Sequence, residues 1–165
     1  MNYAAIKKTD IANGPGVRVS LFVSGCRRHC KGCFNSETWD FNYGNLFGKS
    51  TMNKILEALD KEYIEGFSIL GGEPFENENK ETVYNVIRTV KEKFPQKTIW
   101  CYSGFCFEEL AESSRNILEL IDVLVDGPFV EEKKNLRLKF RGSENQRIID
   151  VKKSLEKGET VEFEI

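Results

Sequence analysis

Three cysteines near the start of the chain have the type and spacing to hold a metal centre. They are Cys26, Cys30 and Cys33, in the sequence Cys-Arg-Arg-His-Cys-Lys-Gly-Cys on a loop that follows an apolar run. Structural zinc and closed iron–sulfur clusters need four ligands. A four-iron cluster on three cysteines keeps one iron without a protein ligand, and that iron can bind a substrate. We therefore expect one such 4Fe-4S cluster per chain.

A closed metal site is the alternative. His29 is the only histidine, but it directly precedes Cys30, which makes shared chelation of one metal awkward. Cys101 or Cys106 can close a four-cysteine site, as in a non-catalytic zinc-binding interaction module. Cys101, however, lies in an apolar run beside Trp100, where a free cysteine behaves as a small hydrophobe. We expect neither Cys101 nor Cys106 to be a ligand or a redox group.

Four short apolar runs are the predicted strands that position this loop. They are Val17–Ser24, Gly66–Leu70, Thr98–Tyr102 and Asp122–Val125. Each ends in a glycine-containing loop: Gly25–Gly32, Gly71–Pro74, Ser103–Phe105 and Asp126–Phe129. In parallel α/β sheets ligands bind at the carboxyl ends of the strands, so these loops are expected to share one rim.

Helical spacing of apolar residues separates the predicted strands. The helical segments are Met52–Leu59, with Ser50 or Thr51 as N-cap, Val83–Phe94, ended by Pro95, and one or two short helices within Leu110–Ile121. Arg147–Val151 and Thr160–Ile165 are predicted as fifth and sixth strands. Strands alternating with helices indicate βαβ units and a mostly parallel sheet.

The length of 165 residues fits a single domain, 1–165, and is too short for a complete eight-stranded α/β barrel, which takes about 250 residues. We expect an α/β fold: a partial (open) TIM-like barrel of about five or six βα units. The net charge of −2 gives no reason to expect nucleic acid as a partner. The chain has no apolar run of the roughly 20 residues that a membrane span needs, and no signal-peptide pattern at Met1–Asn13. We expect a cytoplasmic protein.

The motif Cys-x-x-x-Cys-x-x-Cys after a first strand resembles the signature of radical S-adenosylmethionine enzymes. In that family the three cysteines hold a four-iron cluster, and the amino and carboxylate groups of S-adenosylmethionine chelate its open iron. The residue before the last cysteine is often aromatic in the family and is Gly32 here. The resemblance implies S-adenosylmethionine contacts from the following residues: Gly32, Cys33, Phe34, Gly71, Gly72 and Glu73. Glu73 offers an anionic partner to the ligand's ammonium group.

Further motifs narrow this resemblance. The segment Asn13–Arg18 resembles that of activating enzymes of glycyl-radical enzymes. The segments Cys26–Asn35, Val123–Gly127 and Arg141–Arg147 resemble those of activating proteins of anaerobic ribonucleoside-triphosphate reductases. This implies a reductase large subunit as partner, a one-electron donor such as flavodoxin, and a glycyl radical as product.

Six residues are candidates for the partner or substrate side: Gly14, Pro15, Gly16, Asp126, Gly127 and Arg141. No catalytic side chain is predicted, because the cofactor supplies the reactivity. The alternative within the same chemistry is action on another glycyl-radical protein or on a small molecule. The tail from Lys152 to Ile165 carries no motif.

Overall fold

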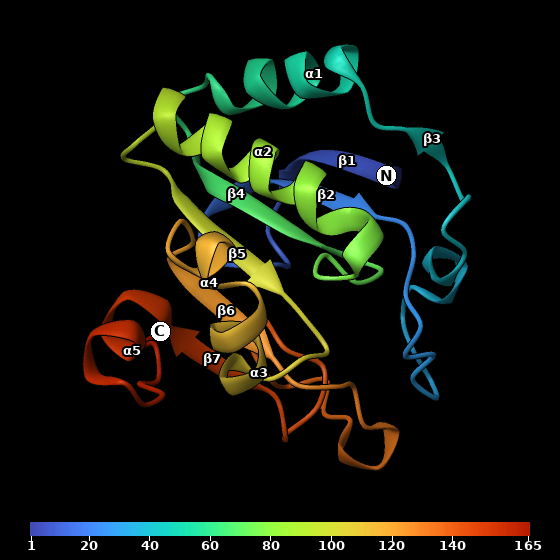
Figure 1. Ribbon diagram of the computed structural model, residues 1–165, viewed down its shortest axis with the longest axis vertical. Coiled ribbons are helices and arrows are strands. Elements are labelled where there is room, and N and C mark those ends of the chain that lie inside the picture. Colours follow the sequence, from blue (N-terminus) through green and yellow to red (C-terminus); the bar gives the residue numbers. More distant parts are fainter.

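The computed structural model describes residues 1–165 and is built on one seven-stranded sheet (Figure 1). The strands are β1 (Asn2–Asp10), β2 (Val17–Val23), β3 (Asn45–Leu46), β4 (Ile64–Gly71), β5 (Thr98–Tyr102), β6 (Val123–Asp126) and β7 (Arg147–Asp150). Their order across the sheet is β3-β1-β2-β4-β5-β6-β7. The four central strands β2, β4, β5 and β6 run parallel, whereas β1, β3 and β7 pair antiparallel with their neighbours.

The predicted α/β class and the four central strands are confirmed, but the sheet is less regular than expected. It is open and mixed, and the parallel part contains four strands instead of five or six βα units. Sequence reasoning overlooked β1, because its run of Lys7, Lys8 and Thr9 has no apolar periodicity and leaves these residues exposed. The predicted strand Thr160–Ile165 is wrong: that segment makes one isolated bridge, between Ile149 and Glu162.

Five helices connect or follow the strands. They are α1 (Lys49–Leu59), α2 (Asn77–Lys93), α3 (Phe107–Ser113), α4 (Arg115–Leu118) and α5 (Val151–Lys157), with short 3-10 turns at Ser36–Trp39 and Glu131–Lys133. The predicted helices are confirmed, although the N-cap of α1 is Gly48 and not Ser50 or Thr51. Thr51 instead accepts a hydrogen bond from the Gly48 N–H at 3.1 Å. None of these helices combines the length and the apolar character that crossing a membrane requires.

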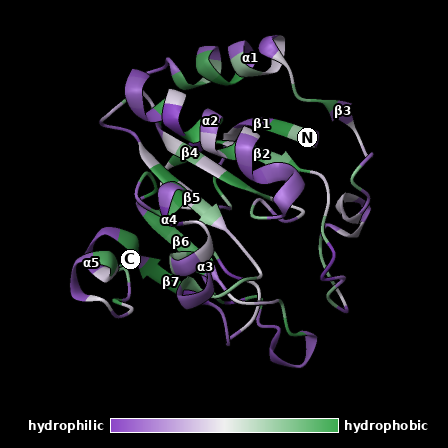
Figure 2. Ribbon diagram, in the orientation of Figure 1, coloured by the Kyte–Doolittle hydropathy of each residue, from purple (hydrophilic) through white to green (hydrophobic).

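The two faces of the sheet bury different sets of residues. Ile99, Cys101 and Leu124 point to the face that α1, α2, α3 and α4 cover, and belong to the main core. Their chain neighbours Trp100, Val123 and Val125 form a second cluster on the opposite face. Figure 2 shows hydrophobic residues along β2, β6 and β7 and a largely hydrophilic outer surface on α2 and α5. The alternation places every second strand residue on the face away from the helices.

Aromatic side chains and a buried arginine close part of that second face. Phe140 and Phe163 pack edge-on against Trp100, with ring centroids 5.4 and 5.6 Å away. Arg18 is fully buried and donates to the Ser68 hydroxyl at 2.8 Å and to the Pro15 carbonyl at 3.2 Å.

The Gly14-Pro15-Gly16 turn lies directly against these groups. At Gly14 φ is +125°, and a Cβ there would come within 2.8 Å of the Arg18 side chain and 3.2 Å of the Trp100 ring. Packing therefore explains the glycine at this position. Asn13, the residue before the turn, is held by the Ser68 hydroxyl, which donates to its carbonyl at 2.6 Å.

Candidate functional site

A cavity of about 440 Å³ lies at the carboxyl ends of the central strands, on the face away from the helices. It is lined by nine of the predicted site residues: Cys26, Cys30, Cys33, Phe34, Gly71, Gly72, Glu73, Gly127 and Arg141. Four other candidates, Gly14, Pro15, Gly16 and Gly32, lie outside the lining, as does Asp126. The cysteine loop and the glycine-rich loop therefore face the same space, as the strand-end rule predicted.

Backbone hydrogen bonds join these two loops at their bases. Gly72 N–H donates to the Val23 carbonyl, and Glu73 N–H donates to the Gly25 carbonyl, both at 2.8 Å. Gly25 N–H donates in turn to the Thr38 carbonyl at 2.7 Å. The segment leading into the cysteines is therefore fixed by the main chain on both sides.

Close packing of these loops explains the two glycines. A Cβ at Gly72 would lie 2.7 Å from the Gly25 carbonyl oxygen and 2.9 Å from the Thr38 carbonyl oxygen. At Gly71 φ is +109°, and a Cβ would lie 2.7 Å from the Val23 carbonyl oxygen. Sequence reasoning attributed the glycines to close approach of a ligand, whereas the structure shows close approach of the neighbouring main chain.

Replacing Gly72 by alanine is therefore expected to lower both stability and cluster content. The added Cβ must push the cysteine loop away, and overpacking of this kind costs roughly 1–3 kcal/mol. Iron and sulfide per chain after anaerobic reconstitution, together with thermal unfolding, measure the effect. Gly48→Ala is the matched control, because nothing lies within 4 Å of a Cβ there. A Gly72→Ala protein with full iron content and unchanged stability would contradict this interpretation.

Glu73 links the loop after β4 to the loop after β5. Its carboxylate is buried and accepts hydrogen bonds from Phe75 N–H at 2.9 Å, the Ser103 hydroxyl at 2.9 Å and Gly104 N–H at 2.7 Å. Burial raises the pKa of Glu73 to about 7, against these hydrogen bonds, which lower it. Glu73, predicted to bind the ammonium group of a ligand, thus also joins the loops that follow β4 and β5.

The three cysteines of the loop form no disulfide bond, and burial raises the pKa of the Cys26 thiol. Cys33 N–H donates to the Cys30 carbonyl at 3.1 Å, and the Cys33 sulfur accepts from Asn35 N–H at 3.4 Å. No three Cys, His, Asp or Glu side chains lie close enough together to hold a single metal ion. The structure presents three thiols lining one cavity, which is the donor chemistry of an iron–sulfur cluster.

Other contacts also hold the cysteine loop. Arg27 N–H donates to the Glu76 carboxylate at 2.7 Å, and the Arg27 guanidinium forms ion pairs with Glu76 and Glu78. The His29 ring stacks on Trp39 with centroids 4.4 Å apart. The loop is therefore anchored to the start of α2 and to the Ser36–Trp39 turn by residues other than the cysteines.

The two remaining cysteines lie outside the cavity lining. Cys101 is fully buried in the main core, where burial raises the pKa of its thiol well above the usual value. Cys106 precedes α3 and is partly buried. Cys101 points to the helix-covered face, on the other side of the sheet from the cavity.

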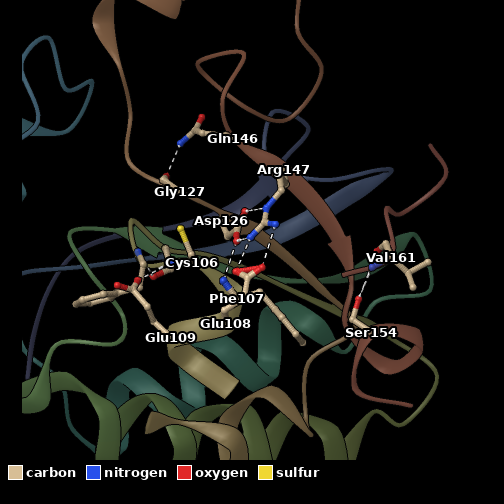
Figure 3. Close-up of polar contacts among 12 residues, drawn as sticks. Cys106, Phe107, Glu108, Glu109, Asp126, Gly127, Gln146, Arg147, Ser154 and Val161 are labelled. Carbon is tan, nitrogen blue, oxygen red and sulfur yellow. Dashed lines mark hydrogen bonds and ion pairs between the residues drawn. The ribbon is translucent and has the colours of Figure 1, made fainter. Parts of the chain in front are cut away.

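Asp126 and Gly127 are adjacent but have different surroundings (Figure 3). Asp126 is buried and pairs with Arg147 through Nε at 3.0 Å and Nη2 at 2.5 Å. It also accepts from Phe107 N–H at 2.7 Å, so it ties β6 to α3 and β7. The Gly127 carbonyl accepts from Gln146 at 3.1 Å, and Gly127 lines the cavity. Of the pair predicted for the substrate side, only Gly127 reaches the cavity.

Sequence reasoning missed several residues that line the cavity. They include Asn13, Phe22, Arg28, Leu70, Tyr102, Phe129 and Phe140. Tyr102 is detectable in principle, since it is the last residue of a predicted strand. Phe129 and Phe140 belong to the long segment between β6 and β7, whose path over the sheet no local pattern reveals.

A family model described as "4Fe-4S single cluster domain" matches residues 12–149 of this chain. The matched region contains the cysteine loop and all four central strands. The site and the fold thus define an iron–sulfur protein with a single 4Fe-4S cluster.

Similar proteins define the class more closely. The chain is 41% identical over 150 residues to the anaerobic ribonucleoside-triphosphate reductase-activating protein of Enterobacteria phage T4. The matched residues make up 90% of this chain and 93% of the phage protein. It is also 41% identical to the protein of that name from Vibrio cholerae over 150 residues, or 90% and 97% of the two chains. For the Escherichia coli K12 protein the identity is 39% over 148 residues, or 88% and 96% of the two chains. The chain belongs to the family of anaerobic ribonucleoside-triphosphate reductase-activating proteins, which confirms the resemblance found in the sequence.

Proposed function

We propose that this chain activates an anaerobic ribonucleoside-triphosphate reductase by generating a glycyl radical on its large subunit. One observation carries the proposal: the three free cysteines and the Gly71-Gly72-Glu73 loop line one cavity, in a chain 41% identical to an activating protein over 150 residues. The glycyl radical itself is the expectation drawn from the sequence motifs.

In this proposal Cys26, Cys30 and Cys33 hold the 4Fe-4S cluster. S-adenosylmethionine would contact the predicted residues that line the cavity, namely Cys33, Phe34, Gly71, Gly72 and Glu73, whereas Gly32 lies outside the lining. When bound, the reduced cluster would supply one electron that breaks a carbon–sulfur bond of S-adenosylmethionine and releases methionine. The deoxyadenosyl fragment would then take a hydrogen atom from a glycine α-carbon and leave as 5′-deoxyadenosine. The protein's own contribution is to bind, orient and exclude water.

The structure suggests how the residues around the cavity orient a ligand and exclude water. Glu73 holds the loop after β5 against the loop after β4 through two hydrogen bonds, from the Ser103 hydroxyl and Gly104 N–H, and its bond from Phe75 N–H fixes its own loop. Phe22, Leu70 and Val125 give the cavity an apolar part. Apolar walls exclude water, and a reactive organic radical needs that protection from side reactions.

The sheet would act as a partial TIM-like barrel in one domain, 1–165, with the cavity on its inner face. Its one-electron donor would be a protein such as flavodoxin. Arg28 is exposed on the cysteine loop and offers positive charge to an acidic donor, whereas the neighbouring Lys31 forms an ion pair with Glu131 at 3.7 Å. Gly127 and Arg141 line the cavity and would face the reductase, with Pro15 and Gly16 as the other partner-side candidates, whereas Gly14 and Asp126 are buried. We place the reaction in the cytoplasm, because clustered free cysteines favour a reducing compartment.

The experiment that tests this proposal starts from protein reconstituted with iron and sulfide without oxygen. Reduced protein is mixed with S-adenosylmethionine, with and without the reductase large subunit, and 5′-deoxyadenosine and reductase turnover are measured. We expect deoxyadenosine to form and the reductase to gain activity. A preparation that binds zinc alone, or an iron–sulfur protein that never supports reductase turnover, would refute the proposal.

A further inference from the structure

One hydroxyl group at the cavity has no hydrogen-bond partner. Tyr102 is the last residue of β5 and lines the cavity, and its hydroxyl oxygen is buried without any partner in the protein. Asn145 Oδ1 is the one other buried side-chain atom in this condition, and Asn145 is not part of the cavity lining. A buried polar group without a partner costs about 1–3 kcal/mol. Tyr102 is therefore a destabilising feature in a place where a ligand can bind.

The surrounding polar groups are fully paired, which makes Tyr102 an exception. The Asp10 carboxylate accepts from Ala12 N–H at 2.9 Å, Asn13 Nδ2 at 2.7 Å and the Ser20 hydroxyl at 2.6 Å. Arg18 likewise uses all three of its guanidinium nitrogens as donors. The interior of this face thus satisfies its own polar groups, whereas the Tyr102 hydroxyl oxygen is buried beside the cavity without a partner.

The position of Tyr102 on its strand makes it part of the cavity floor. Trp100, two residues earlier on the same face, is covered by Phe140 and Phe163. Tyr102 is the next residue on that face, and the cavity begins at its level with Phe22 and Leu70. Burial raises the pKa of Tyr102 well above its usual value, so the phenol is neutral and can both donate and accept.

The chemistry of the proposed substrate matches such a group. A glycine has no side chain, so a protein that selects one glycine must hold it by the main chain around it and by shape. A peptide segment that enters an apolar cavity also brings N–H and C=O groups that need partners there. The cofactor's polar ends, in contrast, are expected at the cysteine and Glu73 loops.

We propose that the Tyr102 hydroxyl hydrogen-bonds to the main chain of the reductase's glycine segment and positions the glycine for hydrogen removal. This inference rests on the proposed function. Tyr102 is a positioning residue in it. The hydroxyl is buried and unpaired in the free protein, and it turns toward the cavity and becomes paired when the segment docks.

The test is Tyr102→Phe, which removes the hydroxyl and keeps the ring. We expect unchanged or higher thermal stability, unchanged iron content and unchanged affinity for S-adenosylmethionine. We expect the KM for the reductase to rise by up to roughly tenfold, the value of one hydrogen bond. The yield of glycyl radical per deoxyadenosine should fall as well, because a misplaced glycine uncouples cleavage from hydrogen removal. Tyr63→Phe is the matched control, since Tyr63 is 61% exposed and is not part of the lining.

Three results would overturn this role. One is a Tyr102→Phe protein that matches the wild type in KM and in radical yield per deoxyadenosine. Another is a loss of S-adenosylmethionine affinity with unchanged KM for the reductase, which would assign the hydroxyl to the cofactor. The third is a loss of thermal stability, which would mean that the hydroxyl is paired within the protein. If the wild type itself forms no radical on the reductase, the proposed function fails instead.

Discussion

Replacing Cys30 by alanine is expected to abolish cluster binding and reduce cleavage of S-adenosylmethionine to background. Cys30 lines the cavity together with Cys26 and Cys33, and two thiols are too few to retain a four-iron cluster that already uses only three. Iron, sulfide and the visible absorption of the cluster after anaerobic reconstitution measure the first effect, and deoxyadenosine formation measures the second.

Cys101→Ala and Cys106→Ala are the matched controls for this experiment. Both thiols lie outside the cavity lining, and Cys101 is buried on the opposite face of the sheet. We expect both variants to keep a full cluster. A complete cluster in Cys30→Ala, or a lost cluster in a folded Cys101→Ala protein, would contradict the assignment.

Replacing Glu73 by alanine is expected to destabilise the protein by about 3 kcal/mol, taking about 1 kcal/mol for each of three donors left without an acceptor. The donors are Phe75 N–H, the Ser103 hydroxyl and Gly104 N–H. Since these groups belong to two different loops, the same change should also open the cavity wall and weaken S-adenosylmethionine binding severely. Urea unfolding and a binding titration measure the two effects.

Two further variants separate the structural role of the Glu73 hydrogen bonds from the effect of its negative charge. Ser103→Ala removes one donor and keeps the carboxylate, so we expect a loss of about 1 kcal/mol and nearly normal cofactor affinity. Glu73→Gln keeps the size but removes the negative charge, so a role toward the ligand's ammonium group predicts weaker binding beyond the loss of stability. If the Glu73→Ala protein were as stable as the wild type, the Glu73 hydrogen bonds would not be what holds the two loops together.

Local patterns in the sequence predicted the central strands and the position of the site. The apolar runs at β2, β4, β5 and β6 are short, buried and bounded by glycine loops, which leaves few alternatives. The cysteine spacing carries its own chemistry, so the sequence alone indicates the metal centre. The edges of the sheet are harder to predict. In β1, which lies next to the two-residue edge strand β3, only Tyr3 and Asp10 are buried, and such a half-exposed strand has weak apolar periodicity.

Contacts between segments far apart in the sequence explain the other features that the sequence did not predict. Asp126 pairs with Arg147, 21 residues later in the chain, and nothing in either local sequence reveals this pair. Phe163 packs on Trp100 from a tail whose alternating residues resemble a strand. At Gly72 the neighbouring atoms belong to Gly25 and Thr38, so the reason for the glycine is visible only after folding.

Electron paramagnetic resonance of the reductase is the measurement that tests the central claim most directly. Reduced, cluster-loaded protein is incubated with S-adenosylmethionine and the reductase large subunit without oxygen. A second sample contains a reductase whose candidate glycine is replaced by alanine. We predict a glycyl radical signal in the first sample and none in the second. Deoxyadenosine formation without any protein radical on the unmodified reductase would contradict the account.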